Sequence, residues 1–208
     1  MTDGTRGRLI ALEGIDGCGK STQASLLADR LGALLTFEPG ATPLGASLRH
    51  LLLHPGEAPV SDRTEALLMA ADRAQHVDQV VRPALDTGRW VVTDRFSAST
   101  LAYQGYGRGL DRSDLERLVG WATGGLVPDL TVFIQVPIAV ARQRRRGAAD
   151  RFEAEDKEFQ FRVADGFLQL AARPPTPWVT IDGGPPVDEV AAAVWSGVTD
   201  RIGVPGGG

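Results

Sequence analysis

The sequence contains a single cysteine, Cys18, in 208 residues. One cysteine excludes a disulfide within the chain, and with it the small disulfide-stapled folds of secreted proteins. We therefore expect a reducing compartment, the cytoplasm, in which Cys18 serves as a small side chain.

Long apolar runs and an excess of positive charge are also missing. No apolar stretch approaches the roughly 20 residues that cross a bilayer, and residues 1–7 lack the apolar centre of a signal peptide. The formal net charge of −4 excludes a broad basic surface, so we expect neither a membrane nor a nucleic acid as partner. Lysine is scarce as well, since Lys20 and Lys157 are the only two among many arginines.

What remains is typical of a globular α/β protein. Hydrophobic residues make up 43% and charged residues 23% of the chain. Short apolar runs alternate with longer helical patterns, which favours a doubly wound domain built on a parallel sheet. We expect one domain over residues 1–208, with a flexible tail at 203–208. The predicted strands are 9–13, 34–37, 90–94, 131–136 and 178–182. The predicted helices are 21–31, 44–53, 63–87, 97–103, 112–121, 138–146, 156–172 and 187–201.

The segment 14–22 reads G-I-D-G-C-G-K-S-T and matches G-x-x-x-x-G-K-[ST], the P-loop. A predicted strand precedes it and a predicted helix follows, which is the context that the motif requires. Its glycines let backbone N–H groups point at phosphate oxygens, and the helix N-terminus adds partial positive charge. We expect Lys20 to reach the β- and γ-phosphates of ATP and the Ser21 hydroxyl to bind Mg²⁺. The expected ATP-binding residues are Gly14, Ile15, Asp16, Gly17, Cys18, Gly19, Lys20, Ser21 and Thr22.

Charged side chains stand where predicted strands end, the edge at which ligands bind in such sheets. Glu38 follows the second predicted strand, and Asp94 and Arg95 end the third. A carboxylate there can hold Mg²⁺, and an arginine beside it can bind a phosphate group through two parallel hydrogen bonds. A surface ion pair between Asp94 and Arg95 is the alternative interpretation.

Arginines gather again near residues 142–156. Their guanidinium groups could close over a transferring phosphoryl group as a mobile lid. A solvated helix end is the other interpretation, and the acidic run at 153–158 argues against a nucleic-acid patch. The arginines in question are Arg142, Arg144, Arg145, Arg146 and Arg151.

Residues 94–105 read D-R-F-S-A-S-T-L-A-Y-Q-G and resemble the signature of thymidylate kinases, D-R-[YF]-x-x-S-x-x-A-Y-Q. The segments 38–40, 45–53, 70–76, 107–109 and 150–153 resemble that family in the correct order. The resemblance implies a P-loop NTPase fold, with a five-stranded parallel sheet, helices on both faces, an arginine-rich lid and a homodimer. It also implies phosphorylation of dTMP to dTDP with ATP and Mg²⁺, in dTTP biosynthesis.

The resemblance assigns roles to single residues. Arg95 would bind the dTMP phosphate, Asp94 would hold the metal with Ser21, and Asp16 would accept a hydrogen bond from the sugar 3′-OH. Arg73 would donate to a thymine carbonyl, and Gln104 would read the N3–H edge. The implied substrate-binding residues are Glu38, Arg49, Met69, Arg73, Arg95, Thr100, Tyr103 and Gln104. The implied catalytic residues are Lys20, Asp16, Arg95, Arg142, Arg144, Arg146 and Arg151.

Three positions depart from the family pattern: Phe37 and Gly17 replace arginines found in other members, and Met69 replaces an aromatic that stacks on thymine. Because Gly17 removes the P-loop arginine, we expect the lid to supply the catalytic one. Tyr103 would exclude a 2′-OH by steric crowding. Two alternative functions are a kinase for another nucleoside monophosphate and a nucleotide-binding protein without turnover.

Overall fold

Five parallel strands form one sheet in the order β2-β3-β1-β4-β5. The computed structural model describes residues 6–54, 59–145, 150–173 and 177–204. The strands are β1 (Leu9–Glu13), β2 (Leu34–Phe37), β3 (Val91–Asp94), β4 (Leu130–Gln135) and β5 (Trp178–Asp182). The five-stranded parallel sheet of the prediction is confirmed, and each strand lies within one residue of its predicted bounds.

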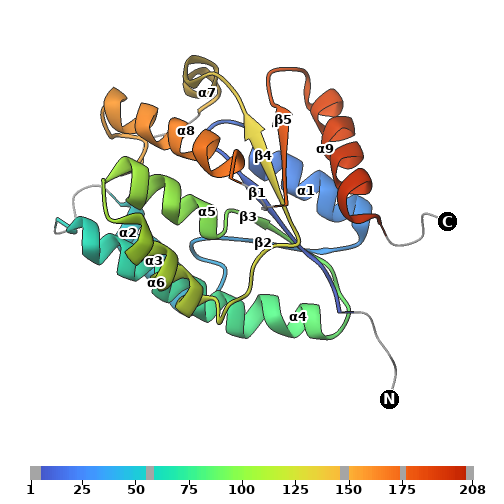
Figure 1. Ribbon diagram of the computed structural model, residues 1–208, viewed down its shortest axis with the longest axis horizontal. Helices are drawn as coiled ribbons and strands as arrows, with labels where there is room; N and C mark the ends of the chain where they lie inside the picture. Colours follow the sequence, from blue (N-terminus) through green and yellow to red (C-terminus); the bar gives the residue numbers. More distant parts are fainter. Residues whose placement is uncertain (1–5, 55–58, 146–149, 174–176, 205–208) are drawn as a thin grey trace.

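Helices cover both faces of the sheet (Figure 1). α1 and α9 pack on one face, whereas η1, η2 and α8 lie with their neighbours on the other. The helices are α1 (Lys20–Leu31), α2 (Pro43–Leu53), α3 (Asp62–His76), η1 (Val77–Val81), α4 (Arg82–Asp86), α5 (Ser97–Thr100), η2 (Leu101–Gly107), α6 (Arg112–Ala122), α7 (Ile138–Arg144), α8 (Lys157–Ala171) and α9 (Val187–Ile202).

Capping residues explain where several helices begin. The side chains of Thr42, Ser61, Asp111 and Asp156 each accept a hydrogen bond from a backbone N–H in the first turn of α2, α3, α6 and α8. α1 is different, because its N-cap is Gly19 in the left-handed conformation and no side chain caps it. Its first N–H groups therefore remain available to an anion.

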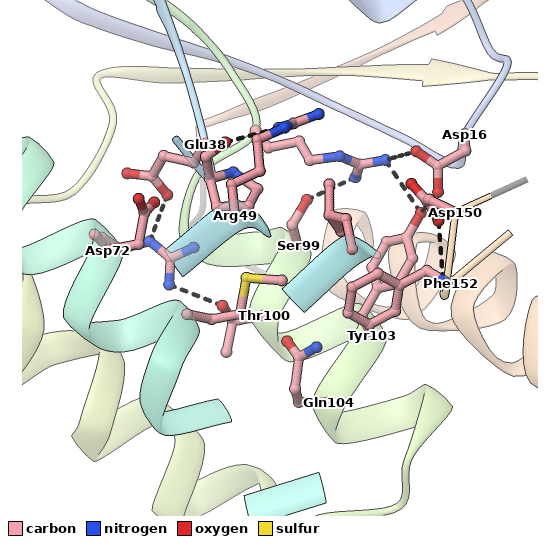
Figure 2. A pocket seen from close by; sticks show the side chains of 15 residues that line it. Asp16, Glu38, Arg49, Asp72, Ser99, Thr100, Tyr103, Gln104, Asp150 and Phe152 are labelled. Atoms are coloured by element: carbon pink, nitrogen blue, oxygen red, sulfur yellow. Dashed lines mark hydrogen bonds and ion pairs between the residues drawn. The ribbon is translucent and has the colours of Figure 1, made fainter. Parts of the chain in front are cut away.

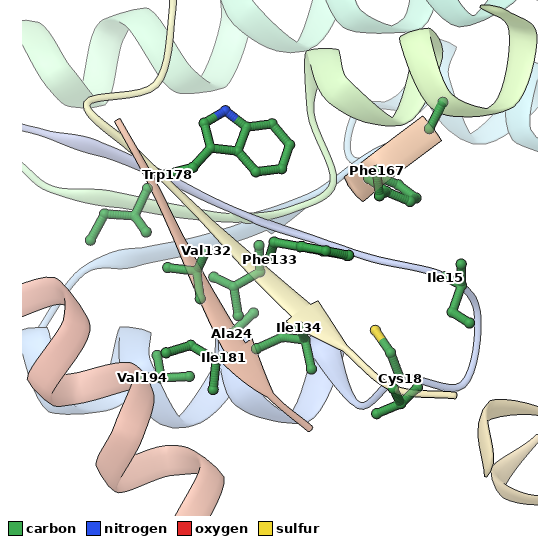
Figure 3. Packing of buried hydrophobic residues seen from close by; sticks show 14 of the residues in the cluster. Ile15, Cys18, Ala24, Val132, Phe133, Ile134, Phe167, Trp178, Ile181 and Val194 are labelled. Atoms are coloured by element: carbon green, nitrogen blue, oxygen red, sulfur yellow. The ribbon is translucent and has the colours of Figure 1, made fainter. Parts of the chain in front are cut away.

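The strands are apolar on both faces, as a covered parallel sheet requires. Along β1, Leu9 and Ala11 pack against η1 and α4, while Ile10 and Leu12 face α1. Figure 3 shows the same alternation on β4, where Phe133 lies with Phe167 on one side and its neighbours lie on the other. The resulting core holds the carboxyl ends of the strands in fixed relative positions.

Two of the predicted α-helices contain π-helical segments in the structure. The predicted helix 63–87 is interrupted by the π-helical segment η1, and the helix after β3 continues as the π-helix η2 to Gly107 rather than ending at 103.

Arg146 and residues 205–208 of the predicted tail lie outside the described residues. Within the described ranges, no helix is both long and apolar enough to cross a membrane.

Candidate active site

The P-loop joins β1 to α1 and takes a backbone path that needs glycine. Gly14, Gly17 and Gly19 have φ values of 147°, 87° and 96°, which side chains with a Cβ rarely adopt. Lys20 begins α1, is buried, and places its Nζ 3.4 Å from Asp16 Oδ1. The loop therefore has the backbone geometry and the fixed cation of a phosphate-binding site.

Ser21 and Asp94 meet beside this loop. β1 and β3 are neighbours in the sheet, with Leu12 in register with Asp94, and the Ser21 hydroxyl donates a hydrogen bond to Asp94 Oδ2. The other carboxylate oxygen, Oδ1, is buried and has no hydrogen-bond partner among the described residues. A hydroxyl and an unsatisfied carboxylate oxygen are donors that suit Mg²⁺. The surface ion pair considered for Asp94 and Arg95 is not the arrangement found.

Arg95 occupies the centre of the site in a strained conformation. Its φ of 72° makes it the only non-glycine residue with positive φ in the described chain. Its guanidinium donates to Gly14 O at 3.1 Å, to Ser99 Oγ at 2.8 Å, to Tyr103 Oη at 3.1 Å and to Asp16 Oδ1. Arg95 is thereby aimed between the P-loop and η2.

Asp16 is the partner that holds Arg95. Burial by itself would raise the pKa of this carboxyl, but the charges of Arg95 and Lys20 outweigh burial and lower the pKa of Asp16 well below its usual value. The hydroxyl group of Tyr103 donates a hydrogen bond to Asp16 Oδ2 at 2.6 Å. Asp16 is thus a carboxylate throughout the neutral pH range and an acceptor for any further hydroxyl.

A buried carboxylate at the end of β1, Glu13, orients the segment that follows Arg95. It accepts hydrogen bonds from Phe96 N at 2.9 Å and from Ser99 N and Oγ at 3.2 Å and 2.6 Å. Burial raises the pKa of Glu13. Our sequence analysis missed this residue, although its position directly before the P-loop and at a strand end was a usable signal.

A second set of contacts lies at the ends of β2 and α3. Arg73 donates from Nε to Glu38 Oε2 at 2.8 Å, from Nη1 to Thr100 Oγ1 at 2.8 Å and from Nη2 to Phe96 O at 3.1 Å. His76 Nδ1 contacts Glu38 Oε1 at 2.8 Å. Arg73 is buried, so it is not a solvated arginine on the surface of α3.

The cavity between these contacts contains every residue that we expected to bind substrate (Figure 2). In the figure, Glu38 and Asp72 lie at one end, Asp16 and Phe152 at the other, and Gln104 lies at the base. The cavity is lined by Asp16, Glu38, Pro39, Arg49, Leu53, Met69, Asp72, Arg73, Arg95, Ser99, Thr100, Tyr103, Gln104, Asp150 and Phe152. Six of these residues were not predicted as site residues: Pro39, Leu53, Asp72, Ser99, Asp150 and Phe152.

A second cavity adjoins the first and contains the P-loop groups. Lys20 and Asp94 line the second cavity alone, and five residues line both: Asp16, Glu38, Arg49, Arg95 and Asp150. The two cavities therefore meet along these shared residues, which include Arg95, with the P-loop on one side and the first cavity on the other.

Asp72 is a carboxyl of the first cavity whose pKa is shifted upward. It accepts a hydrogen bond from Gly40 N at 3.0 Å. Burial, followed by the charge of Glu38, raises the pKa of Asp72 to about 6. This side chain holds the turn after β2 against α3.

The predicted lid arginines contact different parts of the chain. Arg144 donates to Gly183 O at 2.7 Å and to Gly184 O at 3.1 Å, and Arg142 is exposed. Arg151 donates to Leu52 O at 2.9 Å and to Glu65 Oε2 at 2.6 Å, and lines neither cavity.

Arg145 is the described arginine of this segment that reaches the P-loop. Its Nε donates to Asp16 O at 3.2 Å, and a Cβ placed on Gly17 would lie 3.2 Å from its Cγ and 2.2 Å from Ala141 O. A side chain at position 17 would therefore collide with α7, and Arg145 lies beside the space that such a side chain would occupy.

Comparisons with known proteins agree on one family. The family described as Thymidylate kinase matches residues 12–194. A thymidylate kinase of Synechococcus sp. (strain CC9902) is 54% identical over 197 residues, covering 89% of this chain and 93% of the relative. One of Parasynechococcus marenigrum (strain WH8102) is 48% identical over 209 residues, covering 95% and 99%. The crystal structure of thymidylate kinase from Ehrlichia chaffeensis has a TM-score of 0.75 at 32% identity and covers 92% of this chain and 98% of that chain.

Proposed function

This chain belongs to the thymidylate kinase family, and on that premise we propose that it transfers the terminal phosphoryl group of ATP to dTMP, giving ADP and dTDP. The observation that carries the proposal is the junction of the two cavities at Arg95 and Asp16. A nucleoside monophosphate in the first cavity would have its phosphate at that junction, facing the P-loop. Phosphoryl transfer needs this placement of acceptor and donor more than it needs covalent chemistry.

Base recognition follows from the donors and acceptors that line the first cavity. Each guanidinium nitrogen of Arg73 uses one N–H in its protein contacts. The second N–H groups of Nη1 and Nη2 therefore remain to donate to a thymine carbonyl. Gln104 faces the N3–H edge, and the ring of Tyr103 packs where a 2′-OH would lie. Met69 would cover the face of the base with a flexible, polarizable side chain. Asp16 would accept from the 3′-OH.

The phosphates would be held by Lys20, by the loop N–H groups and by Arg95. These groups are fixed by buried contacts before substrate arrives, so they stabilise developing charge without reorganising. Arg145 is supported as the additional cation because it already contacts the P-loop backbone. The roles predicted for Arg142, Arg144, Arg146 and Arg151 stay predictions.

Mg²⁺ fits the oxygen donors of Ser21 and Asp94, whose Oδ1 lacks a hydrogen-bond partner among the described residues. When bound, the ion neutralises charge on the β- and γ-phosphates. The described residues contain no group of three His, Cys, Asp or Glu side chains that could hold a metal. Phosphate and water would therefore complete the coordination, as is usual for Mg²⁺.

We further propose a homodimer that works in the cytoplasm. Large apolar side chains remain exposed on α2, α3 and α6, and α3 packs against both of the others (Figure 1). Leu51, Leu67 and Trp121 are 44%, 58% and 81% exposed, which is typical of an interface. Light scattering of the wild type and of Leu67→Glu tests this: the wild type should have twice the monomer mass, and the variant should shift toward the monomer. A monomeric wild type would contradict the dimer.

The proposed reaction is tested by following ADP and dTDP formation from ATP and dTMP, with dUMP, dCMP, UMP and AMP as competing acceptors. We expect dTMP to have the highest kcat/KM. Preference for another monophosphate would favour the alternative kinase, and nucleotide binding without product would favour a protein without turnover.

A further inference from the structure

Glu65 is a buried carboxylate on α3 with no role in the reaction described above. Its side chain is fully buried, and it does not line the substrate cavity. Oε1 accepts from Gln104 Nε2 at 2.8 Å and from Arg108 Nε at 3.3 Å. Oε2 accepts from Arg108 Nη2 at 3.0 Å and from Arg151 Nη2 at 2.6 Å. We propose that Glu65 is a positioning residue that fixes the orientation of the Gln104 amide and thereby sets the preference for a base with a hydrogen on N3.

The carboxylate itself is held firmly by its other partners. Two guanidinium groups donate to Glu65, and Arg108 is anchored in turn by Glu155 at 2.5 Å. Bonds of this charge-assisted kind are the stronger ones in proteins. The Oε1 atom therefore occupies a fixed position toward Gln104.

The Gln104 amide has two chemically different ends. Its nitrogen only donates and its oxygen only accepts, and rotation by half a turn exchanges them. A carboxylate oxygen can only accept, so Gln104 must turn its nitrogen toward Glu65. Because Gln104 is buried and lines the cavity, its carbonyl oxygen is the end left for the ligand.

An acceptor at this point selects the base. Thymine and uracil carry a hydrogen on N3 and can donate to the Gln104 oxygen. Cytosine has a lone pair on N3, which would face that oxygen and leave both acceptors unpaired in a buried site. The inference rests on the proposed function, and it adds the residue outside the pocket that decides which pyrimidines are accepted.

The test measures kcat/KM for dTMP and for dCMP in the wild type and in Glu65→Gln. A carboxamide at position 65 can donate as well as accept, so the Gln104 amide can turn over. We expect the dTMP-to-dCMP ratio to fall by about ten-fold or more, with KM for ATP changed by less than about two-fold. Glu65→Asp keeps the charge but moves the carboxylate away from Gln104, because its side chain is one methylene shorter. This variant should also lower the dTMP-to-dCMP ratio, and it replaces Glu65→Gln in the test if that variant does not fold.

Asp62→Asn is the matched control. Asp62 lies on the same helix and 3.6 Å from Arg108, is half exposed, and makes no contact with Gln104. The same chemical change at this position should leave the ratio as in the wild type.

A double-mutant comparison separates positioning from a general structural effect. In a Gln104→Ala background, Glu65→Gln should change the ratio by less than about two-fold, because the residue through which it acts is gone. An unchanged ratio in the folded single variants, or an equal fall in the Gln104→Ala background, would overturn the inference. A wild type that does not phosphorylate dTMP would contradict the proposed function instead.

Discussion

Tyr103 combines two roles that a pair of substitutions can separate. Its hydroxyl donates to Asp16 Oδ2 at 2.6 Å and accepts from Arg95 at 3.1 Å. Its ring packs edge-on against Phe152, with ring centroids 5.6 Å apart. Tyr103→Phe removes the hydroxyl and keeps the ring, whereas Tyr103→Ala removes both.

Tyr103→Phe should weaken the support of Asp16 and Arg95 without opening the pocket. Hydrogen bonds to charged groups contribute about 1.5 to 3 kcal/mol each, so a loss of about 2 kcal/mol in the free energy of unfolding is expected. If a similar amount is lost in the transition state, kcat/KM for dTMP falls by roughly 10- to 30-fold. The preference for dTMP over its ribonucleotide counterpart should be retained, because the ring still crowds the 2′-OH.

The assay compares kcat/KM for the deoxy and ribo acceptors in the wild type and both variants. Tyr103→Ala should improve the relative use of the ribo acceptor. Tyr106→Phe is the control, since the only other tyrosine has its hydroxyl bonded to Arg112 at an exposed site. If Tyr103→Phe keeps full activity, the hydroxyl does not position Arg95. If it admits the ribo acceptor as well as Tyr103→Ala does, steric exclusion by the ring is wrong.

Four further predictions follow from the same contacts. Lys20→Met should lower kcat by about 100-fold or more in a folded protein, which steady-state kinetics with a thermal melt would check. Arg145→Ala should lower kcat more than it raises KM for dTMP; equal kcat in variant and wild type would remove Arg145 from the mechanism. Met69→Phe should tighten dTMP binding modestly by supplying a rigid ring face, and calorimetry showing weaker binding would contradict this. Because the pKa of Asp72 is raised to about 6 when folded, the native state binds the extra proton between pH 4 and 6, so stability falls as pH rises through this window. Asp72→Asn should lack that fall and be more stable at pH 7 by about 1 to 2 kcal/mol in denaturant titrations.

The strands and the P-loop could be predicted from sequence because each is a local pattern, whereas the predicted pocket residues came from the resemblance to a family. Apolar runs that cannot face water locate the strands, and the spacing of Gly14, Gly19 and Lys20 is set by the phosphates that the loop must hold. The signature 94–105 then placed Arg95, Tyr103 and Gln104 on one segment. These features need no knowledge of long-range contacts.

The role of Glu65 could not be predicted in the same way. Glu65 lies in the first turn of α3, where an acidic side chain is favoured by the helix dipole and is usually solvated. Only the packing of η2 against α3 buries it, with Arg108 and Gln104 as partners. Contacts of this kind join residues about 40 positions apart and leave no periodic trace.

The lid arginines show a different limit. The helix predicted for this segment runs from 138 to 146. The helix instead ends at Arg144, and Arg145 has an extended backbone, with φ of −65° and ψ of 138°. This change of conformation turns its side chain to the P-loop, and nothing in the local pattern marks where the helix stops.

The most direct test of the central claim is the competition of nucleoside monophosphates for phosphoryl transfer from ATP in the presence of Mg²⁺, with the products separated by chromatography. The account predicts dTDP as the main product, the highest kcat/KM for dTMP, and loss of all products in Lys20→Met. Faster formation of dUDP, dCDP or UDP from their monophosphates, faster consumption of AMP than of dTMP, or ATP binding without any dTDP, would contradict it.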